Sequence, residues 1–209
     1  MTPFTTLTSI AVPLIRDNVD TDTIIPSREM RTTGKTGLAE GLFAPWRYLD
    51  ADARTVNQDF ALNNPRYAGA QILLAGKNFG CGSSREHAVW ALAEYGFRCV
   101  IAESFAPIFR NNCVRNGLLP IDLGRPAPPE MVDAIVTIDL ASQSIQCRDV
   151  FRLFHIGEEA KIMLLEGLDA IDLTLKHKSI IRNWHTADRI VRPWAYLNPP
   201  PHLSDGEDS

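Results

Sequence analysis

The chain has 209 residues, of which 45% are hydrophobic and 22% are charged. These values are typical of a globular protein and exclude disorder of the whole chain, and domains of about 100–200 residues predict a single domain. The formal net charge of −4 argues against a protein that coats nucleic acid or a membrane surface.

The sequence shows no pattern of a targeting signal and no closely spaced pair of cysteines. No window approaches the roughly 18 apolar residues of a membrane-spanning helix, and residues 1–15 lack the basic region of a secretory signal. The four cysteines form no C-x-x-C pair, so the usual zinc and iron–sulfur spacings are missing and reduced thiols are expected. We therefore expect a cytoplasmic protein that binds no metal with its own cysteines.

The N-terminal part begins with a strand. Hydrophobic residues alternate over residues 4–15, which is typical of a half-buried strand, and a polar loop follows at residues 17–22. Residues 27–41 show no apolar period and are predicted to form a mobile loop. Residues 45–64 are less distinct and are expected to hold one short helix.

The central part predicts a βαβα unit around residues 70–117. Two short apolar runs indicate buried strands, and each is followed by a segment with helical spacing. Such an order implies that the two strands pair in parallel through a right-handed crossover. The segments are a strand at 70–75, a helix from Ser83 to Gly96, a strand at 99–102 and a helix from Ser104 to Gly117.

The C-terminal part predicts strands over residues 132–151 and helices at 158–166 and 176–191. We expect one domain over residues 1–197. Residues 198–209 are polar and acidic and are predicted to form a flexible tail.

The most informative segment is the loop that follows the strand at residues 70–75. Its glycines at 76, 80 and 82 do not fit the dinucleotide pattern G-x-G-x-x-G, but they allow backbone N–H groups to approach an anion. Ser83 and Glu86 have the spacing of a capping box, which predicts that the helix begins at Ser83. Arg85 can hold a carboxylate with two hydrogen bonds, or it can pair with Glu86 or Glu94.

Other polar residues near this loop have simpler interpretations. Cys81 is expected to be a small packed side chain, and His87 a core histidine with its hydrogen bonds satisfied. Asp20, Asp22 and Glu29 stand at calcium-loop offsets, but the glycine that such a loop needs is replaced by Thr23. These carboxylates are therefore expected to hydrogen-bond their own loop.

The run Lys77-Asn78-Phe79-Gly80-Cys81-Gly82-Ser83-Ser84-Arg85-Glu86-His87-Ala88 resembles the signature of the swivel domain of the aconitase superfamily. Further motifs resemble the bacterial small-subunit family of isopropylmalate dehydratases, and the resemblance extends over about residues 4–195. They include Asp20-Thr21-Asp22-x-Ile24-Ile25-Pro26, the segments 41–48, 95–98, 105–113 and 116–121, and the segment 167–175.

This resemblance implies a swivelling β/β/α domain, like the fourth domain of aconitase, that forms half of a hydro-lyase. The other half is a large subunit that carries a [4Fe–4S] cluster, and no cofactor is expected on this chain. The implied reaction isomerises 2-isopropylmalate to 3-isopropylmalate through 2-isopropylmaleate, in leucine biosynthesis.

The resemblance also implies roles for residues of the signature. Ser83 is expected to be the catalytic base, Ser84 and Arg85 bind a substrate carboxylate, and the Gly82 backbone approaches the substrate. Donors at the helix start and in the loop would stabilise the serine oxygen when it loses its proton.

The loop after Pro26 is where the family selects the variable substituent of the substrate, and the sequence departs there from the family's Lys-x-Phe-Leu-Lys pattern. Met30 can contact an isopropyl group, whereas Arg28 or Arg31 can face a third carboxylate. The second hypothesis is therefore a related hydro-lyase that acts on citraconate, dimethylmalate or homoaconitate. A third hypothesis is a non-catalytic module that only binds an anion.

Overall fold

The computed structural model describes residues 1–30, 34–50 and 52–196. The chain forms two compact units, Met1–Ala170 and Ile171–Ser209. The single domain expected over residues 1–197 stays a prediction, and the predicted acidic tail at 198–209 lies outside the described residues.

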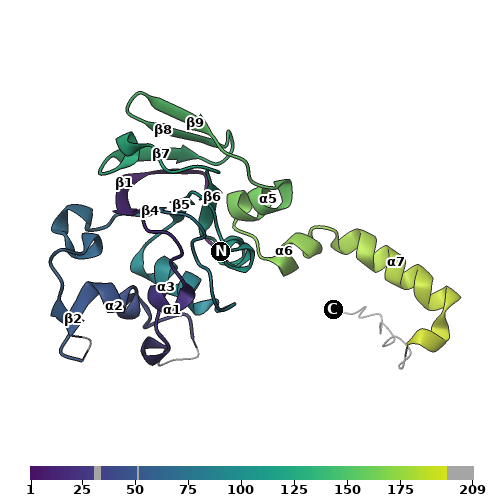
Figure 1. Ribbon diagram of the computed structural model, residues 1–209. Helices are drawn as coiled ribbons and strands as arrows, with labels where there is room; N and C mark the ends of the chain where they lie inside the picture. The colour runs from purple at the N-terminus through teal and green to yellow at the C-terminus, as the bar shows by residue number, and fades with distance from the viewer. Residues whose placement is uncertain (31–33, 51, 197–209) are drawn as a thin grey trace, which may run out of the picture. The chain divides into compact units, whose positions relative to one another are not determined.

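Unit 1 is built on a mixed sheet in the order β6-β5-β4-β1-β7-β8-β9 (Figure 1). Strands β6, β5, β4 and β1 run parallel, and β7, β8 and β9 form an antiparallel meander. The α/β class with a swivel-type mixed sheet is confirmed. The strands are β1 (Thr6–Leu14), β4 (Ile72–Ala75), β5 (Cys99–Ala102), β6 (Leu119–Asp122), β7 (Ile135–Asp139), β8 (Ser144–Cys147) and β9 (Val150–Leu153).

Strand β1 joins the two halves of this sheet. Its first half, from Thr6 to Ile10, pairs antiparallel with β7, and its second half, from Ala11 to Leu14, pairs parallel with β4. Its last residue, Leu14, lies opposite Ala75, the last residue of β4. The loops that follow β1 and β4 therefore leave the sheet at the same edge.

The predicted βαβα unit is confirmed. Helix α3 (His87–Tyr95) connects β4 to β5, and helix α4 (Pro107–Arg115) connects β5 to β6. Strands β4 and β5 pair in parallel, with Ile72 opposite Cys99. Helix α5 (Glu158–Glu166) also has its predicted bounds and ends at Gly167, which has a φ of 71°.

The one short helix expected in residues 45–64 is present as a single turn at the start of this segment, and a hairpin that the sequence does not predict follows it. The segment holds a one-turn helix α2 (Ala44–Arg47) and a hairpin of β2 (Tyr48–Asp50) and β3 (Thr55–Val56). The Asp50 carboxylate accepts the N–H groups of Asp52 and Ala53, so a turn forms where the helix would have continued.

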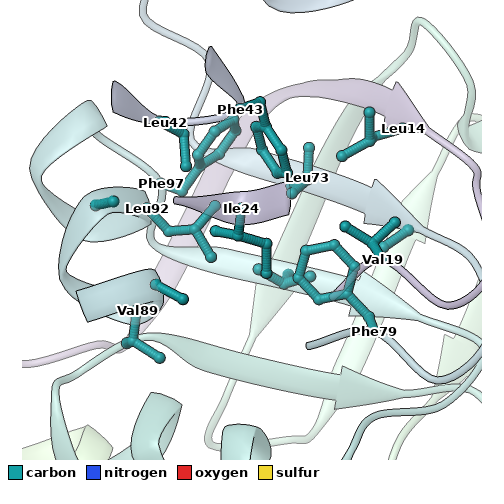
Figure 2. Packing of buried hydrophobic residues seen from close by; sticks show 14 of the residues in the cluster. Leu14, Val19, Ile24, Leu42, Phe43, Leu73, Phe79, Val89, Leu92 and Phe97 are labelled. Atoms are coloured by element: carbon teal, nitrogen blue, oxygen red, sulfur yellow. The ribbon is translucent and has the colours of Figure 1, made fainter. Parts of the chain in front are cut away.

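The hydrophobic core of unit 1 surrounds helix α1 (Thr21–Ile24). Ile24 and Ile25 are fully buried, and Figure 2 shows Ile24 among residues from β4, α3 and the segment before α2. Helices α1, α2 and α3 gather on one side of β1 and β4 (Figure 1). The polar loop that follows β1 is therefore anchored in the core by Ile24 and Ile25 at the end of α1.

Unit 2 contains most of α6 (Ala170–Leu175), then α7 (Lys178–Val191) and a final turn of 3-10 helix. The predicted helix at residues 176–191 is confirmed by α7, whereas α6 was not predicted. Helix α7 is amphipathic and none of its residues is buried. Among the described residues, no helix combines the length and the apolar character needed to cross a membrane.

Close packing at Gly80 gives a first prediction. Gly80 has a φ of 76°, and a Cβ there would lie 2.1 Å from Cγ of Phe109, whereas Gly69 has a φ of 73° with open space around it. Gly69→Ala should therefore cost about 1–2 kcal/mol, from the left-handed backbone alone. Gly80→Ala should cost a further 1–3 kcal/mol or so, because it also overpacks the core. Urea unfolding measures both values, and equal losses would contradict the packing at Gly80.

Candidate functional site

Two loops at the edge of the sheet run side by side and form the framework of the candidate site. The glycine loop (residues 76–82) follows β4, and residues 15–20 follow β1. Lys77 accepts the N–H of Asn18 at 2.8 Å, Gly80 donates its N–H to Val19 at 2.8 Å, and Cys81 accepts the N–H of Thr21 at 2.9 Å. The backbones are thus held together along their whole length.

Glycine is required at position 76 for this close approach. A Cβ at Gly76 would lie 2.5 Å from the carbonyl oxygen of Arg16 and 2.5 Å from Oδ1 of Asp17. Asp17 also accepts the N–H of Lys77 at 2.8 Å. A side chain at position 76 would push the two loops apart, so the close contact between the loops depends on this glycine.

The hydroxyl of Thr21 holds the backbone of Ser83. Thr21 is 1% exposed, and its Oγ1 lies 3.2 Å from both the N–H and the carbonyl oxygen of Ser83. Residues 83–85, the serine–arginine segment, are therefore kept outside helix α3. The prediction that the helix begins at Ser83 is wrong, because α3 begins at His87 and the residue before it, Glu86, makes no side-chain cap.

Arg85 is held by one polar group from α1 and one from the turn after Pro26. Its Nη1 forms an ion pair with Asp22 and donates to the hydroxyl of Ser27 at 3.0 Å. The pairing with Glu86 or Glu94 that the sequence left open is not found. Glu86 instead accepts from Asn116 at 3.2 Å.

The predicted substrate-site residues lie together on the surface. Gly82, Ser83 and Ser84 are exposed, and Arg85 is half-buried. Gly82 has a φ of 93° and stands above Asp20 and Thr21. The Ser83 hydroxyl makes no hydrogen bond to another residue in the described part of the chain, so its oxygen is free to meet a ligand.

Comparisons with known proteins agree on one family. A family model described as the aconitase C-terminal domain matches residues 1–126. A 3-isopropylmalate dehydratase small subunit from Cupriavidus necator is 51% identical over 207 residues, which cover 95% of this chain and all of that protein. A protein of the same name from Agrobacterium fabrum is 47% identical over 203 residues, with 93% of this chain and all of the relative covered. The chain belongs to the family of 3-isopropylmalate dehydratase small subunits.

A solved structure supports the same family. The crystal structure of a 3-isopropylmalate dehydratase from Methanocaldococcus jannaschii aligns with a TM-score of 0.63 and 29% sequence identity. The alignment covers 85% of this chain and 98% of the archaeal one. The fold of this small-subunit family is therefore found across distant members.

The loop after Pro26 contains the residues predicted to select the substrate. Arg28 is exposed, and its Nε lies 3.6 Å from the carboxylate of Glu29. Met30 is half-buried and packs against the hydrophobic core. Arg31 lies outside the described residues.

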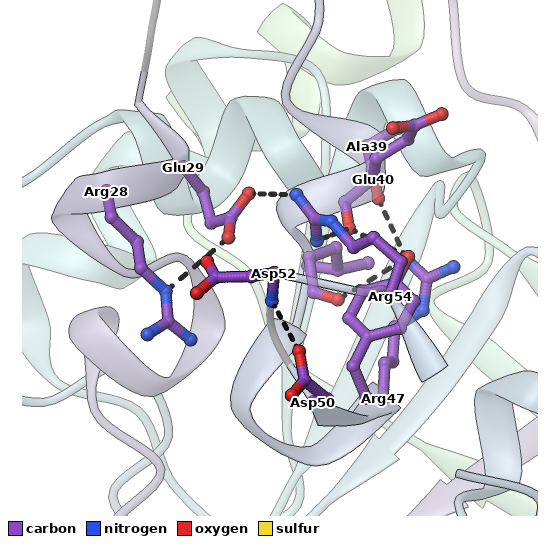
Figure 3. Close-up of polar contacts among 10 residues, drawn as sticks. Arg28, Glu29, Ala39, Glu40, Arg47, Asp50, Asp52 and Arg54 are labelled. Atoms are coloured by element: carbon purple, nitrogen blue, oxygen red, sulfur yellow. Dashed lines mark hydrogen bonds and ion pairs between the residues drawn. The ribbon is translucent and has the colours of Figure 1, made fainter. Parts of the chain in front are cut away.

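Glu29 and Arg54 form an ion pair that the sequence analysis missed. Oε2 of Glu29 lies 2.5 Å from Nη2 of Arg54, and Figure 3 shows the two side chains directed toward each other. Glu29 is expected from the sequence to hydrogen-bond its own loop, yet it is only 6% exposed and pairs with an arginine outside that loop. The sequence carries no signal for this pair, because Arg54 lies 25 residues further along the chain in a segment whose structure the sequence leaves indistinct.

The other end of the loop that follows Pro26 is hydrogen-bonded to helix α3. The carboxylate of Glu94 accepts the N–H groups of Gly37, Leu38 and Ala39 at 2.5–2.9 Å. Partial desolvation alone would raise the pKa of Glu94, but the three donors outweigh it and hold the pKa below its usual value. Carboxylates therefore anchor the chain on both sides of residues 31–33.

The polar residues near the site do not form a metal centre. Within the described residues, no three His, Cys, Asp or Glu side chains gather as a ligand set. Asp20 accepts the N–H of Thr23 at 2.6 Å, as the loop interpretation predicted, whereas Asp22 and Glu29 pair with arginines. Burial and the nearby Asp20 raise the pKa of Cys81, which favours a protonated thiol.

His87 lies one turn into the predicted helix and is the first residue of α3. Its ring packs on Trp90, with ring centroids 4.7 Å apart, and the side chain is half-buried. The prediction of a core histidine is therefore too strong. The contact with Trp90 gives His87 a packing role at the start of the helix.

The contacts of Thr21 give a second prediction. Thr21→Val keeps the shape of the side chain but leaves two backbone groups of Ser83 without a partner. The free energy of unfolding should fall by about 1–3 kcal/mol, and the Ser83 amide should exchange faster with solvent. Urea unfolding and hydrogen exchange measure these effects.

A matched control is Thr8→Val on β1, where the exposed hydroxyl contacts only the hydroxyl of Thr137 at 2.9 Å. Its effect on stability should stay within about 0.5 kcal/mol. If both variants lose the same stability and Ser83 exchange is unchanged, Thr21 does not hold the serine–arginine segment.

Proposed function

We propose that this chain is the small subunit of a two-chain hydro-lyase that isomerises 2-isopropylmalate to 3-isopropylmalate through 2-isopropylmaleate. Water is first removed from the substrate and then added back at the neighbouring carbon. The observation that carries the proposal is the exposed Ser83 beside Arg85, with both residues held by the loop after β1.

Ser83 is proposed to be the catalytic base. Its oxygen takes a proton from the carbon next to a substrate carboxylate during dehydration and returns a proton during hydration. A serine oxygen needs positive potential nearby to lose its own proton. The guanidinium of Arg85 and the N–H groups of the glycine loop are the groups of this chain that can supply it.

Arg85 is proposed to bind a carboxylate of the substrate, with Ser84 and the Gly82 backbone beside it. In the chain by itself, Arg85 pairs with Asp22, whose side chain is 59% exposed. An exposed ion pair stabilises by at most about 1 kcal/mol, so a substrate carboxylate can compete with Asp22 for the guanidinium. A bidentate contact then fixes the orientation of the substrate.

The identity of the variable substituent is part of the proposal. Met30 packs against the hydrophobic core and can give an isopropyl group an apolar contact. This contact favours the isopropyl substrate over homoaconitate. The names of the bacterial relatives support the same choice.

The partner is proposed to be a large subunit, as the small-subunit name of the relatives implies. A [4Fe–4S] cluster is proposed to lie on that partner, as the family resemblance implies, where it would act as the Lewis acid that accepts the hydroxide leaving the substrate. The glycine loop and residues 17–37 are expected to border the large subunit, and the enzyme is proposed to work in the cytoplasm.

Assembly with a large subunit tests this proposal. The chain should show no turnover when purified alone, because it supplies only the base and the carboxylate-binding groups. The reconstituted pair should hydrate 2-isopropylmaleate with a higher kcat/KM than citraconate or homoaconitate, measured by the loss of the alkene absorbance. Turnover by the isolated chain, or no hydration of 2-isopropylmaleate by the pair, would contradict the proposal.

Replacement of Ser83 separates catalysis from anion binding. Ser83→Ala should lower kcat of the assembled enzyme by about 10²–10⁴, the usual contribution of a general base. Its stability should stay within about 0.5 kcal/mol of the parent, because the serine does not cap the helix. Thermal unfolding and kinetics measure the two quantities.

Ser142→Ala is the matched control, since this serine hydroxyl hydrogen-bonds Asp139 at 2.8 Å on an exposed turn. The control should retain full kcat. Full kcat in Ser83→Ala as well would favour a module that only binds an anion.

A further inference from the structure

A buried carboxylate in the loop after Pro26 has no role in the chemistry proposed above. The side chain of Glu29 is 5% exposed, although the neighbouring Ser27 and Arg28 in the same turn are exposed. Burial of a carboxylate is costly unless a partner neutralises it. The position of Glu29 therefore depends on the groups that face it.

Arg54 is the main partner of Glu29. Beyond the ion pair, its Nη1 donates to the carbonyl oxygen of Glu40 at 3.4 Å, and its guanidinium lies 4.7 Å from the ring centre of Tyr48 (Figure 3). The hydrogen bond to Glu29 raises the pKa of Arg54, so the guanidinium stays charged. Arg54 is thus contacted by Tyr48 of the hairpin and by the 3-10 turn Ala39–Gly41, and it presents its planar fork to Glu29.

The turn that carries Glu29 also carries Ser27. Residues Ser27–Glu29 form one turn of 3-10 helix, in which Glu29 donates to Pro26 at 2.9 Å and Met30 donates to Ser27 at 3.1 Å. The hydroxyl of Ser27 accepts from Arg85 at 3.0 Å. A continuous chain of contacts therefore runs from Arg54 through Glu29 and Ser27 to Arg85.

We propose that Glu29 and Arg54 are positioning residues that set the location of the Arg85 guanidinium through Ser27. The hairpin of β2 and β3 holds the turn, and the turn holds one side of the arginine that binds the substrate carboxylate. This inference rests on the proposed function for its effect on substrate binding, but the contact chain itself can be tested without turnover.

Gly41 gives the ion pair its space. A Cβ at Gly41 would lie 2.5 Å from Cβ of Glu29, and the φ of Gly41 does not require glycine. A methyl group there would displace Glu29 by steric contact alone. Gly41→Ala therefore perturbs the same contact chain without removing a charge.

The kinetic test uses the small subunit reconstituted with its large subunit. Arg54→Gln should raise KM for 2-isopropylmaleate about three- to tenfold and leave kcat within about twofold, because it weakens an interaction that binds substrate. Ser27→Ala should do the same. The double variant should raise KM no further than the larger single effect, because both act on one chain of contacts.

The matched control is Arg66→Gln, which removes another arginine–carboxylate pair, with Asp133 at 3.2 Å, that shares no partner with Arg85. Its KM should equal that of the parent enzyme. Arg54→Lys should raise KM less than Arg54→Gln does, because lysine retains the positive charge but not the planar fork of the guanidinium. KM effects of Ser27→Ala and Arg54→Gln that multiply in the double variant would overturn the proposal.

A second readout needs no activity. The guanidinium NMR resonances of Arg85, assigned by their loss in Arg85→Lys, should shift in Arg54→Gln and in Gly41→Ala but not in Arg66→Gln. If they do not move in folded Arg54→Gln, the positioning role is excluded. If they move while the wild-type pair shows no hydration of any substrate, the contact chain holds and the proposed function fails.

Discussion

The hydroxyl of Thr21 determines where the candidate site lies. It engages both the N–H and the carbonyl group of Ser83, so a residue that has helix-capping spacing in the sequence is kept in a bend outside the helix. A buried polar side chain that satisfies two backbone groups at once is difficult to displace. Ser83 is therefore presented at the surface on a backbone that the core holds in place.

The sheet explains why Thr21 can reach Ser83. Strands β1 and β4 are parallel neighbours and end opposite each other at Leu14 and Ala75. Strand β1 also pairs with β7 on its other side, so the direction of the sheet changes at this strand. Ligand sites in open α/β sheets lie at the carboxyl ends of strands where the topology changes, and the two loops meet at such a place.

Much of this arrangement could be predicted from the sequence. The β-strands at 72–75 and 99–102, the crossover between them and helix α5 follow from short apolar runs, helical spacing and glycine at the helix ends. The start of α3 could not be predicted, because Ser83 and Glu86 satisfy the local capping pattern and a contact from residue 21 overrides it. Local patterns contain no information about such a distant partner.

The Glu29–Arg54 pair escaped prediction for the same reason, since a carboxylate in a polar loop gives no sign of burial. The family resemblance locates Ser83, Ser84 and Arg85, whereas the structure adds what holds them: Thr21 for the serine backbone, and Asp22 with Ser27 for the arginine. These supporting residues lie within residues 21–27, which reach into the segment after Pro26 that we propose selects the substrate. In this proposal, substrate binding and substrate choice are coupled through one short stretch of chain.

The most direct test of the account is a crystal structure of the assembled two-subunit enzyme with a non-reactive hydroxy-diacid analogue. The account predicts that Ser83 Oγ lies within about 3 Å of the carbon-bound proton's position and that Arg85 has exchanged Asp22 for an analogue carboxylate. It also predicts that the contacts between Thr21 and Ser83 persist. An analogue bound away from Ser83, or an Arg85 still paired with Asp22 in the occupied site, would contradict it.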